Sequence, residues 1–306
     1  MTRKFDPVQL GSIEIFLKAA ETLSFAKAAV ELGLGAPAVS RSIARLEKRV
    51  GSRLFTRSTR RIRLTEDGRL YQEQCSQALN QIADVEDILG SQRRAPSGLI
   101  RVSVPTTYAH YRIIPLLPEF ARRFPDIRIE LNISNQNIDF ITEGFDLAIR
   151  MGKLPDSSLV ARRLEQAALG VFAAPSYLQA QGEPRTLSDL KQHKLVLFER
   201  PSSGRTFPWE FSDGTRDIEM TMKSAVMFSG DFLGCVNFAI AGGGLVQAYD
   251  FIAEQYVKTG KLIEVLQAFR GHTRPFSLLY PEKHNLAPRV RAFIDYISET
   301  LVSHAT

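Results

Sequence analysis

The first third of the chain alternates between apolar stripes at helical spacing and short polar breaks. The first stripe predicts a helix from about Val8 to Thr22 with one apolar face, formed by Leu10, Ile13, Phe16, Leu17 and Ala20. Ser24 can cap a second helix, which runs from Phe25 to about Leu32, and Gly33 can end it. Three short helices are therefore expected before residue 51.

A third helix begins near Pro37, because the missing N–H of proline is tolerated in a first turn, and Gly51 stops it. Its buried stripe is expected to be Val39, Ile43, Leu46 and Val50. Its outward face combines small residues, which allow close approach, with arginines that can reach guanine edges or phosphates. Two helices joined by a tight glycine turn predict a helix-turn-helix, although an ordinary helical hairpin has the same pattern. The candidate DNA contacts here are Ser24, Pro37, Ser40, Arg41 and Arg45.

Residues 53–64 alternate apolar and basic side chains around a polar tip, which predicts a β-hairpin beside the third helix. Phe55, Ile62 and Leu64 are expected to pack inward. Wings of this kind commonly place arginines on phosphates or in the minor groove. The candidate DNA contacts of the wing are Arg57, Ser58, Thr59, Arg60 and Arg61.

A long helix is predicted after the wing, with Thr65 as its cap and Gly90 at its end. At about 1.5 Å per residue it would be roughly 38 Å long. Apolar residues recur along it with heptad spacing, which favours pairing with a second copy of the helix. Packing against the chain's own domain is the alternative. The expected seam is Tyr71, Cys75, Ala78, Ile82, Val85 and Leu89.

Strands and helices alternate after a polar segment at 91–98, which reads as a linker. Strands are expected at 100–104, 127–133 and 145–149, with a helix between the first two. A second series follows from about residue 168, with strands at 169–173, 195–198, 225–228 and 276–280 and helices ending near 240 and 297. This order predicts an α/β fold with a mostly parallel, doubly wound sheet, arranged in two lobes with a cleft.

Polar turns follow several of these strands. Ligands of such sheets bind at the carboxyl ends of the strands, near the N-termini of helices, so these turns are candidate ligand contacts. Plain capping of the helices is the alternative interpretation of each turn. The candidates are Thr106, Thr107, Ser134, Asn135, Ser229 and Asp231, together with Glu199, Arg200 and Ser202 in a nearby loop.

The charge of the chain is concentrated in its first third. The 306 residues include 39 Lys and Arg against 33 Asp and Glu, and residues 1–94 alone hold 16 basic and 11 acidic side chains. A local basic cluster on a small domain is typical of nucleic-acid binding, although a solvated surface has the same composition. Two distant cysteines, Cys75 and Cys235, suggest a reducing, cytoplasmic setting. Both are expected to be small buried residues, with redox sensing as the alternative. The uncharged stretch 232–249 is expected to be a buried helix and a glycine turn rather than a membrane span.

An enzyme is the main alternative class of protein. The sequence contains no HExxH, GxxxxGK or GxSxG motif, and its five histidines form no pair with metal-ligand spacing. Two separated cysteines do not suggest a zinc site. We therefore expect neither a catalytic site nor a metal or cofactor.

The N-terminal motifs resemble those of LysR-type transcriptional regulators. They are Phe25-Ala26-Lys27-Ala28-Ala29, Pro37-Ala38-Val39-Ser40-Arg41, Leu54-Phe55-Thr56-Arg57 and Leu64-Thr65-Glu66-Asp67-Gly68. One departure stands before the proline, where the family usually has a serine and often a glutamine and this chain has Gly35 and Ala36. The second part of the chain is similar to the effector domain of the same family, and that domain is similar to type 2 periplasmic binding proteins. The resembling segments are Glu143-Gly144-Phe145-Asp146-Leu147-Ala148-Ile149-Arg150, Leu159-Val160-Ala161-Arg162-Arg163-Leu164 and Gly242-Gly243-Gly244-Leu245-Val246.

This resemblance implies a winged helix-turn-helix domain at 1–64, a linker and dimerisation helix with a hinge at 65–96, and an effector-binding domain at 97–306. It implies one lobe at 97–166 and 270–303 and a second at 167–269. The implied protein is a cytoplasmic regulator that binds double-stranded operator DNA and is switched by a small-molecule effector. It also implies a homodimer or tetramer, with RNA polymerase as a further partner.

Overall fold

The computed structural model comprises two compact units, Met1–Gly90 and Ser91–Thr306. It describes residues 7–57, 62–90, 95–136, 143–152, 159–199, 204–224, 226–281 and 286–304.

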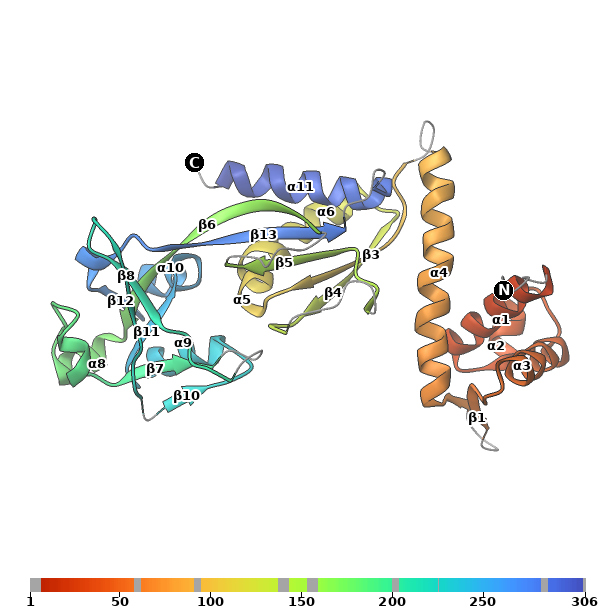
Figure 1. Ribbon diagram of the computed structural model, residues 1–306, viewed down its shortest axis with the longest axis horizontal. Helices are drawn as coiled ribbons and strands as arrows, with labels where there is room; N and C mark the ends of the chain where they lie inside the picture. Colours follow the sequence, from red (N-terminus) through yellow and green to blue (C-terminus); the bar gives the residue numbers. More distant parts are fainter. Residues whose placement is uncertain are drawn as a thin grey trace. The chain divides into compact units, whose positions relative to one another are not determined.

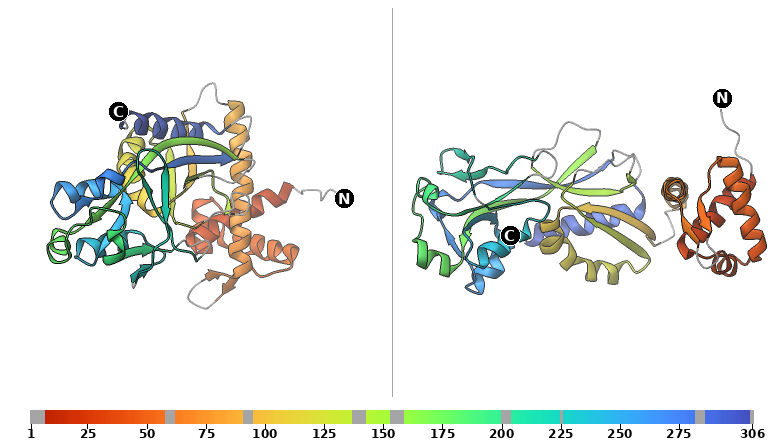
Figure 2. Two further views of the ribbon diagram at one scale, coloured as in Figure 1. Left: turned by 60° about the vertical axis from the view of Figure 1, so that its left-hand side comes forward. Right: turned by 90° about the horizontal axis from the view of Figure 1, so that it is seen from below.

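The first unit contains the three helices and the hairpin that the sequence predicts. Its elements are α1 (Pro7–Thr22), α2 (Phe25–Glu31), α3 (Ala36–Val50), β1 (Phe55–Arg57), β2 (Ile62–Leu64) and α4 (Glu66–Gly90). α2 and α3 end near the glycines that the sequence predicts as their ends: Gly33 and Gly51 both have left-handed φ angles, of 64° and 81°. α1 packs against α4, and α2 and α3 pack against α1 and against each other (Figures 1 and 2).

The hydrophobic core of this unit is formed mainly by side chains from the central turns of its helices. Its buried side chains include Phe16, Ile43, Leu46, Leu54 and Phe55. Two residues expected on the buried stripes are instead exposed, Leu10 by 48% and Val50 by 41%. Both expectations were wrong, because these residues lie in terminal turns, where a helix extends beyond the neighbours that bury its middle.

The second unit is built on one continuous sheet whose strand order is β10-β7-β11-β6-β13-β5-β3-β4, with β12 paired to β6. Its strands are β3 (Gly98–Val104), β4 (Ile127–Ile133), β5 (Leu147–Met151), β6 (Leu159–Ala173), β7 (Leu195–Phe198), β10 (Val226–Phe228), β11 (Leu245–Tyr249), β12 (Ile263–Val265) and β13 (Thr273–Pro281). We call the part around β3, β4 and β5 lobe I and the part around β7, β10 and β11 lobe II.

Two long strands connect the lobes. β6 and β13 pair antiparallel from Leu159 with Pro281 to Ala168 with Thr273, and both run from one half of the domain to the other (Figure 1). Within each lobe the sheet is parallel, as β3 pairs with β4 and β7 with β10. The expectation of a mostly parallel sheet thus holds inside the lobes and was wrong at their junction.

A separate two-stranded hairpin belongs to lobe II and was not predicted. It consists of β8 (Trp209–Ser212) and β9 (Asp217–Met220), which pair antiparallel. The side chains of Trp209 and Phe211 are buried in a core cluster of lobe II. These aromatic side chains anchor the hairpin, and its opposite face is left for polar residues.

Both lobes also contain helices (Figure 1). Lobe I has α5 (Thr106–Tyr108), the π-helix η1 (Ala109–Ile113), η2 (Ile114–Leu116), α6 (Leu117–Arg123) and α11 (Pro288–His304). Lobe II has α8 (Pro175–Gln181), η3 (Asp189–Gln192), α9 (Leu233–Ile240), α10 (Asp250–Lys258) and η4 (Gln267–Phe269). The uncharged stretch 232–249 forms α9, a glycine turn and β11, which confirms the predicted helix and turn.

Candidate functional site

The outward face of α3 presents the residues expected to meet DNA. Pro37, Arg41 and Arg45 are exposed, and their spacing of four residues places them on one face; Ser40 is half-buried beside them. Gly35 is the N-cap residue and offers no side-chain hydrogen bond to the first turn. The departure from the family pattern at this position therefore leaves the backbone N–H groups of the helix start uncapped by a side chain.

Two serines of this unit have structural partners. Ser24, a candidate DNA contact, accepts a hydrogen bond from the backbone N–H of Lys27 at 3.3 Å and so caps α2 as predicted. Ser42, which was not singled out, is buried on the inner side of α3, where its hydroxyl donates to that of Ser12 in α1 at 3.3 Å. This bond joins the inner side of α3 to α1, beside the buried residues Val39, Ile43 and Leu46.

The wing is tied to α3 by a carboxylate. Oε1 of Glu47 accepts hydrogen bonds from the backbone N–H groups of Leu54 at 2.8 Å and Phe55 at 3.0 Å. Phe55 pairs with Leu64 across the hairpin and is buried, as expected. The candidate contacts Ser58, Thr59, Arg60 and Arg61, and the side chain of Arg57, lie outside the described residues.

The long helix α4 begins as predicted. The hydroxyl of Thr65 accepts from the N–H of Gly68 at 2.8 Å and donates to the carbonyl of Arg53 at 2.7 Å. Gly68 is required by close approach, since a Cβ there would overlap the carbonyl oxygen of Leu54. The start of α4 is therefore held against the segment that leads into β1.

The predicted seam on α4 divides into two parts. Tyr71 packs edge-on against Phe16 at 5.3 Å between ring centroids, within its own unit, and burial raises the pKa of the half-buried Cys75 thiol. Farther along, Ala78 is exposed, as are Ile82 by 49% and Val85 by 55%. The side chain of Leu89 lies outside the described residues. An apolar surface is thus left on the middle of α4.

The second unit contains a cavity of about 860 Å³ between its lobes. Lobe I contributes the ends of β3, β4 and β5, lobe II contributes β7, the β8–β9 hairpin and β11, and the start of β13 lines one side. The carboxyl ends of the strands of lobe I meet here, which is where open α/β sheets bind ligands.

Three of the residues predicted as effector contacts, Thr107, Ser134 and Asn135, line the cavity on the lobe I wall. Asn135 holds two elements at once: its Oδ1 accepts from the backbone N–H of Thr106 at 3.1 Å, and its Nδ2 donates to the carbonyl of Gly230 in lobe II at 2.8 Å. Thr106 itself is half-buried and is not among the lining residues.

Arg150 at the end of β5 also lines this wall and was not predicted as a contact. Its Nη1 donates to the carbonyls of Ser103 and Ile149, and its Nη2 to the hydroxyl of Ser103 and the carbonyl of Gln136, at 2.7–3.2 Å. All four acceptors are uncharged. Burial lowers the pKa of Arg150 to about 10, against a smaller opposing effect of Glu143.

The lobe II wall is aromatic. Phe198 stacks with Phe207 at 6.1 Å between ring centroids and meets Phe232 edge-on at 5.4 Å. Tyr249, at the end of β11, donates to the sulfur of Met151 in lobe I at 3.1 Å, so the two lobes touch again along the cavity. An apolar body bound here would contact ring faces on one side.

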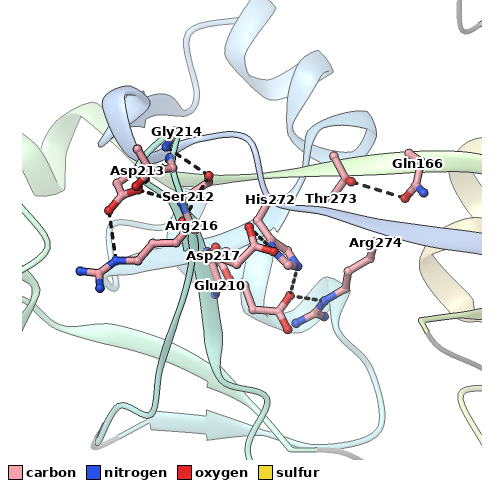
Figure 3. Close-up of polar contacts among 12 residues, drawn as sticks. Gln166, Glu210, Ser212, Asp213, Gly214, Arg216, Asp217, His272, Thr273 and Arg274 are labelled. Atoms are coloured by element: carbon pink, nitrogen blue, oxygen red, sulfur yellow. Dashed lines mark hydrogen bonds and ion pairs between the residues drawn. The ribbon is translucent and has the colours of Figure 1, made fainter.

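An ionic cluster joins the hairpin to β13 (Figure 3). Oε2 of Glu210 lies 2.7 Å from Nε of Arg274 and 2.9 Å from Nε2 of His272. Asp217 lies 3.3 Å from the other ring nitrogen of His272. The guanidinium of Arg274 also covers the ring of Phe207 at 5.2 Å. Although burial opposes it, the pKa of Arg274 is raised because Tyr249 and Glu210 surround the guanidinium.

The remaining predicted contacts are placed differently. Glu199, Ser229 and Asp231 are not among the lining residues. Asp231 accepts from the N–H of Leu233 at 3.0 Å, which is the capping alternative considered for this turn. Arg200 and Ser202 lie outside the described residues. Arg150 could have been singled out from the sequence, because it is an arginine next to the last apolar residues of a buried strand. Glu210, His272 and Arg274 come together only through the fold.

Among the residues that the structure describes, no group of three or more His, Cys, Asp or Glu side chains is arranged to hold a metal ion. Within the same ranges, no helix has the length and apolar character needed to cross a membrane.

Comparison with known proteins gives a consistent result over both units. Residues 10–69 match the bacterial regulatory helix-turn-helix protein, lysR family, and residues 93–302 match the LysR substrate binding domain. An HTH-type transcriptional regulator of Xanthomonas campestris pv. campestris is 35% identical, over 92% of this chain and 83% of its own length.

Two solved structures extend the comparison to three dimensions. CrgA of Neisseria meningitidis, a LysR-type transcriptional regulator, is 29% identical with a TM-score of 0.62, covering 97% of this chain and 99% of its own. The Vibrio cholerae virulence activator AphB, a member of the LTTR protein family, is 26% identical with a TM-score of 0.60, covering 94% and 98%.

Proposed function

This chain belongs to the LysR family of DNA-binding transcriptional regulators, and on that basis we propose that the cavity between its lobes binds the small effector that controls it. The observation that carries the proposal is the cavity of about 860 Å³, lined by residues from both lobes. Its size falls within the range of about 300–1,000 Å³ that is typical of small-molecule sites. We assign effector binding, and not catalysis, to this cavity.

The proposed mechanism is a shift between two arrangements of the lobes. Asn135 with Gly230, and Tyr249 with Met151, are direct contacts between the lobes at the cavity. A ligand that fits one lobe arrangement better than another raises the population of that arrangement. Regulation follows if the arrangements also differ in how they present the DNA-binding domains.

For DNA recognition, the proposal places the exposed face of α3 in the major groove and the wing on the adjacent backbone or minor groove. Arg41 and Arg45 extend from that face, with Ser40 and Pro37 beside them. Ser24 lies at the start of the preceding helix. The wing contacts Arg57, Ser58, Thr59, Arg60 and Arg61 stay part of the proposal on the basis of their sequence.

Oligomerisation is proposed to occur through α4. The exposed apolar residues Ala78, Ile82 and Val85 follow heptad spacing and would be covered by the same helix of a second copy. We further propose boundaries at 1–64, 65–96 and 97–306 for the three functional parts. A regulator of this kind would work in the cytoplasm with RNA polymerase, either as a dimer or as a tetramer.

The test combines DNA binding with a cavity-filling variant. Fluorescence-labelled DNA from the region upstream of the protein's own gene is titrated with full-length protein at several salt concentrations, with random DNA as competitor. Compounds are then sought that change this binding. Ala248 is buried and lines the cavity, so Ala248→Leu is expected to reduce the effect of such a compound on DNA binding at least tenfold. Ala180 is exposed on α8, so in Ala180→Leu the compound should change DNA binding as it does in the wild type.

Two results would contradict the proposal. One is the absence of specific binding to the upstream DNA at every salt concentration. The other is an effector whose action is unchanged in Ala248→Leu, provided that circular dichroism and DNA affinity show this variant to be folded.

A further inference from the structure

One face of the β8–β9 hairpin is acidic and faces the cavity. The register places Glu210 directly opposite Glu219, and Asp217 lies two residues before Glu219 on the same face. All three line the cavity, while Phe211 and Ile218 of the other face pack in the core of lobe II. Like charges opposite each other in an antiparallel pair repel, so this arrangement lacks a local structural benefit.

The counter-charges available to this face are incomplete. Glu210 is matched by Arg274, and His272 lies between Glu210 and Asp217. Among the residues that the structure describes, none of the ion pairs includes Glu219. The hairpin side of the cavity therefore presents three carboxylates to one permanently charged arginine. Asp217 and Glu219 are both exposed and therefore solvated, and a cation supplied by a ligand would replace that water.

The opposite wall has the reverse imbalance. Arg150 donates to four uncharged oxygens of lobe I, and the described lobe I residues that line the cavity with it include no carboxylate. The carboxylate of Glu143, in the same lobe, is not among these lining residues and only partly offsets the effect of burial on the pKa of Arg150. Its fifth donor, Nε–H, has no hydrogen bond to another described residue. Hydroxyls of Thr107 and Ser134 lie on the same wall. A bound carboxylate would receive both charge and hydrogen bonds there.

The space between these walls suits an apolar body next to an ammonium group. Phe198, Phe207 and Phe232 line it on the lobe II side. Aromatic faces attract cations as well as apolar groups, and carboxylates beside them strengthen the attraction for an amine. A singly charged molecule would leave one of the two charged walls unmatched, and a neutral molecule would leave both unmatched.

From this polarity we infer that the effector is a small zwitterion of the amino-acid type, whose carboxylate faces Arg150 and whose ammonium faces Glu219 and Asp217. The inference rests on the proposed function, since it concerns the ligand of the same cavity. Because the two charges lie on different lobes, only a molecule that carries both groups contacts both walls. Such a ligand would favour the arrangement in which the lobes are close together.

The experiment uses matched sets of three probes on full-length protein, measured by calorimetry and by thermal shift. Each set contains an amino acid, the acid that lacks its amino group and the amine that lacks its carboxylate. The sets are phenylalanine, phenylpropanoate and phenethylamine; leucine, isocaproate and isoamylamine; and aminocaproate, caproate and pentylamine. We expect at least one amino acid to bind, and to bind tenfold or more tighter than both of its singly charged partners.

Two variants then assign each charge to its wall. In Arg150→Gln the advantage of the amino acid over the amine should disappear while its advantage over the acid stays; in Glu219→Gln the pattern should be reversed. Glu183→Gln, an exposed carboxylate of lobe II that does not line the cavity, should behave like the wild type. Arg150→Lys keeps the charge without the four hydrogen bonds, and it covers the case in which the glutamine variant fails to fold.

The outcomes separate the inference from the proposed function. Binding of the acids or amines as tightly as the amino acids, or of none of the nine probes, would overturn the inference. If another compound shifts the melting temperature of the wild type but not of Ala248→Leu, the proposal that the cavity binds the effector is supported. The inference that the effector is a zwitterion is then wrong. If a probe binds equally well to Ala248→Leu, the cavity itself is not the site.

Discussion

The side-chain amide of Asn135 donates a hydrogen bond to the carbonyl oxygen of Gly230 at 2.8 Å and so links lobe I to lobe II at the cavity. The same amide accepts the N–H of Thr106, the first residue after the β3 turn. One side chain thus contacts both the start of α5 in lobe I and the loop before α9 in lobe II. A ligand that enters the cavity next to Asn135 acts on both.

We therefore predict that Asn135→Ala frees the Thr106 amide and loosens the link between the lobes. Hydrogen exchange at Thr106 should become at least tenfold faster, and the second unit should lose about 1 kcal/mol of stability, the usual net value of a hydrogen bond. Exchange measured by mass spectrometry on the peptide that contains Thr106 checks this. Asn132→Ala, at an exposed position of β4, serves as the control; equal effects in both variants would contradict the linking role.

For DNA recognition, we predict that Arg41→Ala lowers operator affinity by about 1–3 kcal/mol and relaxes the preference for bases. The guanidinium is exposed on the outward face of α3, so its loss should leave the fold intact. Binding is measured on the operator and on random DNA. Equal losses on both would show that Arg41 contacts only phosphate. Arg185→Ala, an exposed arginine of the second unit, is the control.

The carboxylate of Glu47 is predicted to position the wing. Glu47→Ala leaves the N–H groups of Leu54 and Phe55 without their acceptor, at an expected cost of about 1–3 kcal/mol in the first unit. Glu47→Gln keeps one acceptor oxygen and should lose less. Thermal unfolding followed by circular dichroism, together with DNA affinity, tests the order alanine, glutamine, wild type. A glutamine variant as weak as the alanine variant would show that the charge itself is required.

Much of the first unit could be predicted because its boundaries are set by local residues. Ser24, Gly33, Gly51 and Thr65 each act on their own helix end, within a few residues of the chain. The end of β6 that runs from Leu159 could not be predicted as a strand. Its residues include two adjacent arginines and do not alternate, and its strand conformation comes from pairing with β13.

The candidate cavity shows the same division. Thr107, Ser134 and Asn135 follow strands of lobe I, so topology alone brings them to one edge. Glu210 and Arg274 are far apart in sequence and meet because the hairpin lies against β13. Local patterns carry no information about such a long-range contact.

The thiol of Cys235 is predicted to be inert in the folded protein. Burial, with a smaller effect of Asp231, raises its pKa to about 12, so the thiolate fraction near pH 8 is about a thousandfold below that of an ordinary cysteine. In Cys75→Ser, modification by a disulfide reagent should be very slow and should accelerate on unfolding. The raised pKa also contributes stability that is complete below about pH 9 and is lost as the pH rises toward 12, because the unfolded chain ionises first. Rapid modification of the folded variant would contradict this assignment.

The contact between α4 and the wing strand can be tested at a single glycine. Gly68→Ala places a methyl group on the carbonyl oxygen of Leu54, and we expect the first unit to lose about 1–3 kcal/mol, because backbone on both sides restricts relaxation. Gly11→Ala is the matched control: it lies in α1 with open space around it, so it should be neutral or stabilising by about 0.5–1 kcal/mol. The sole tryptophan, Trp209, belongs to the second unit, so its fluorescence transition should stay unchanged while circular dichroism shows the early loss of helix. A shift of the tryptophan transition, or equal stability of the two variants, would contradict the assigned contact.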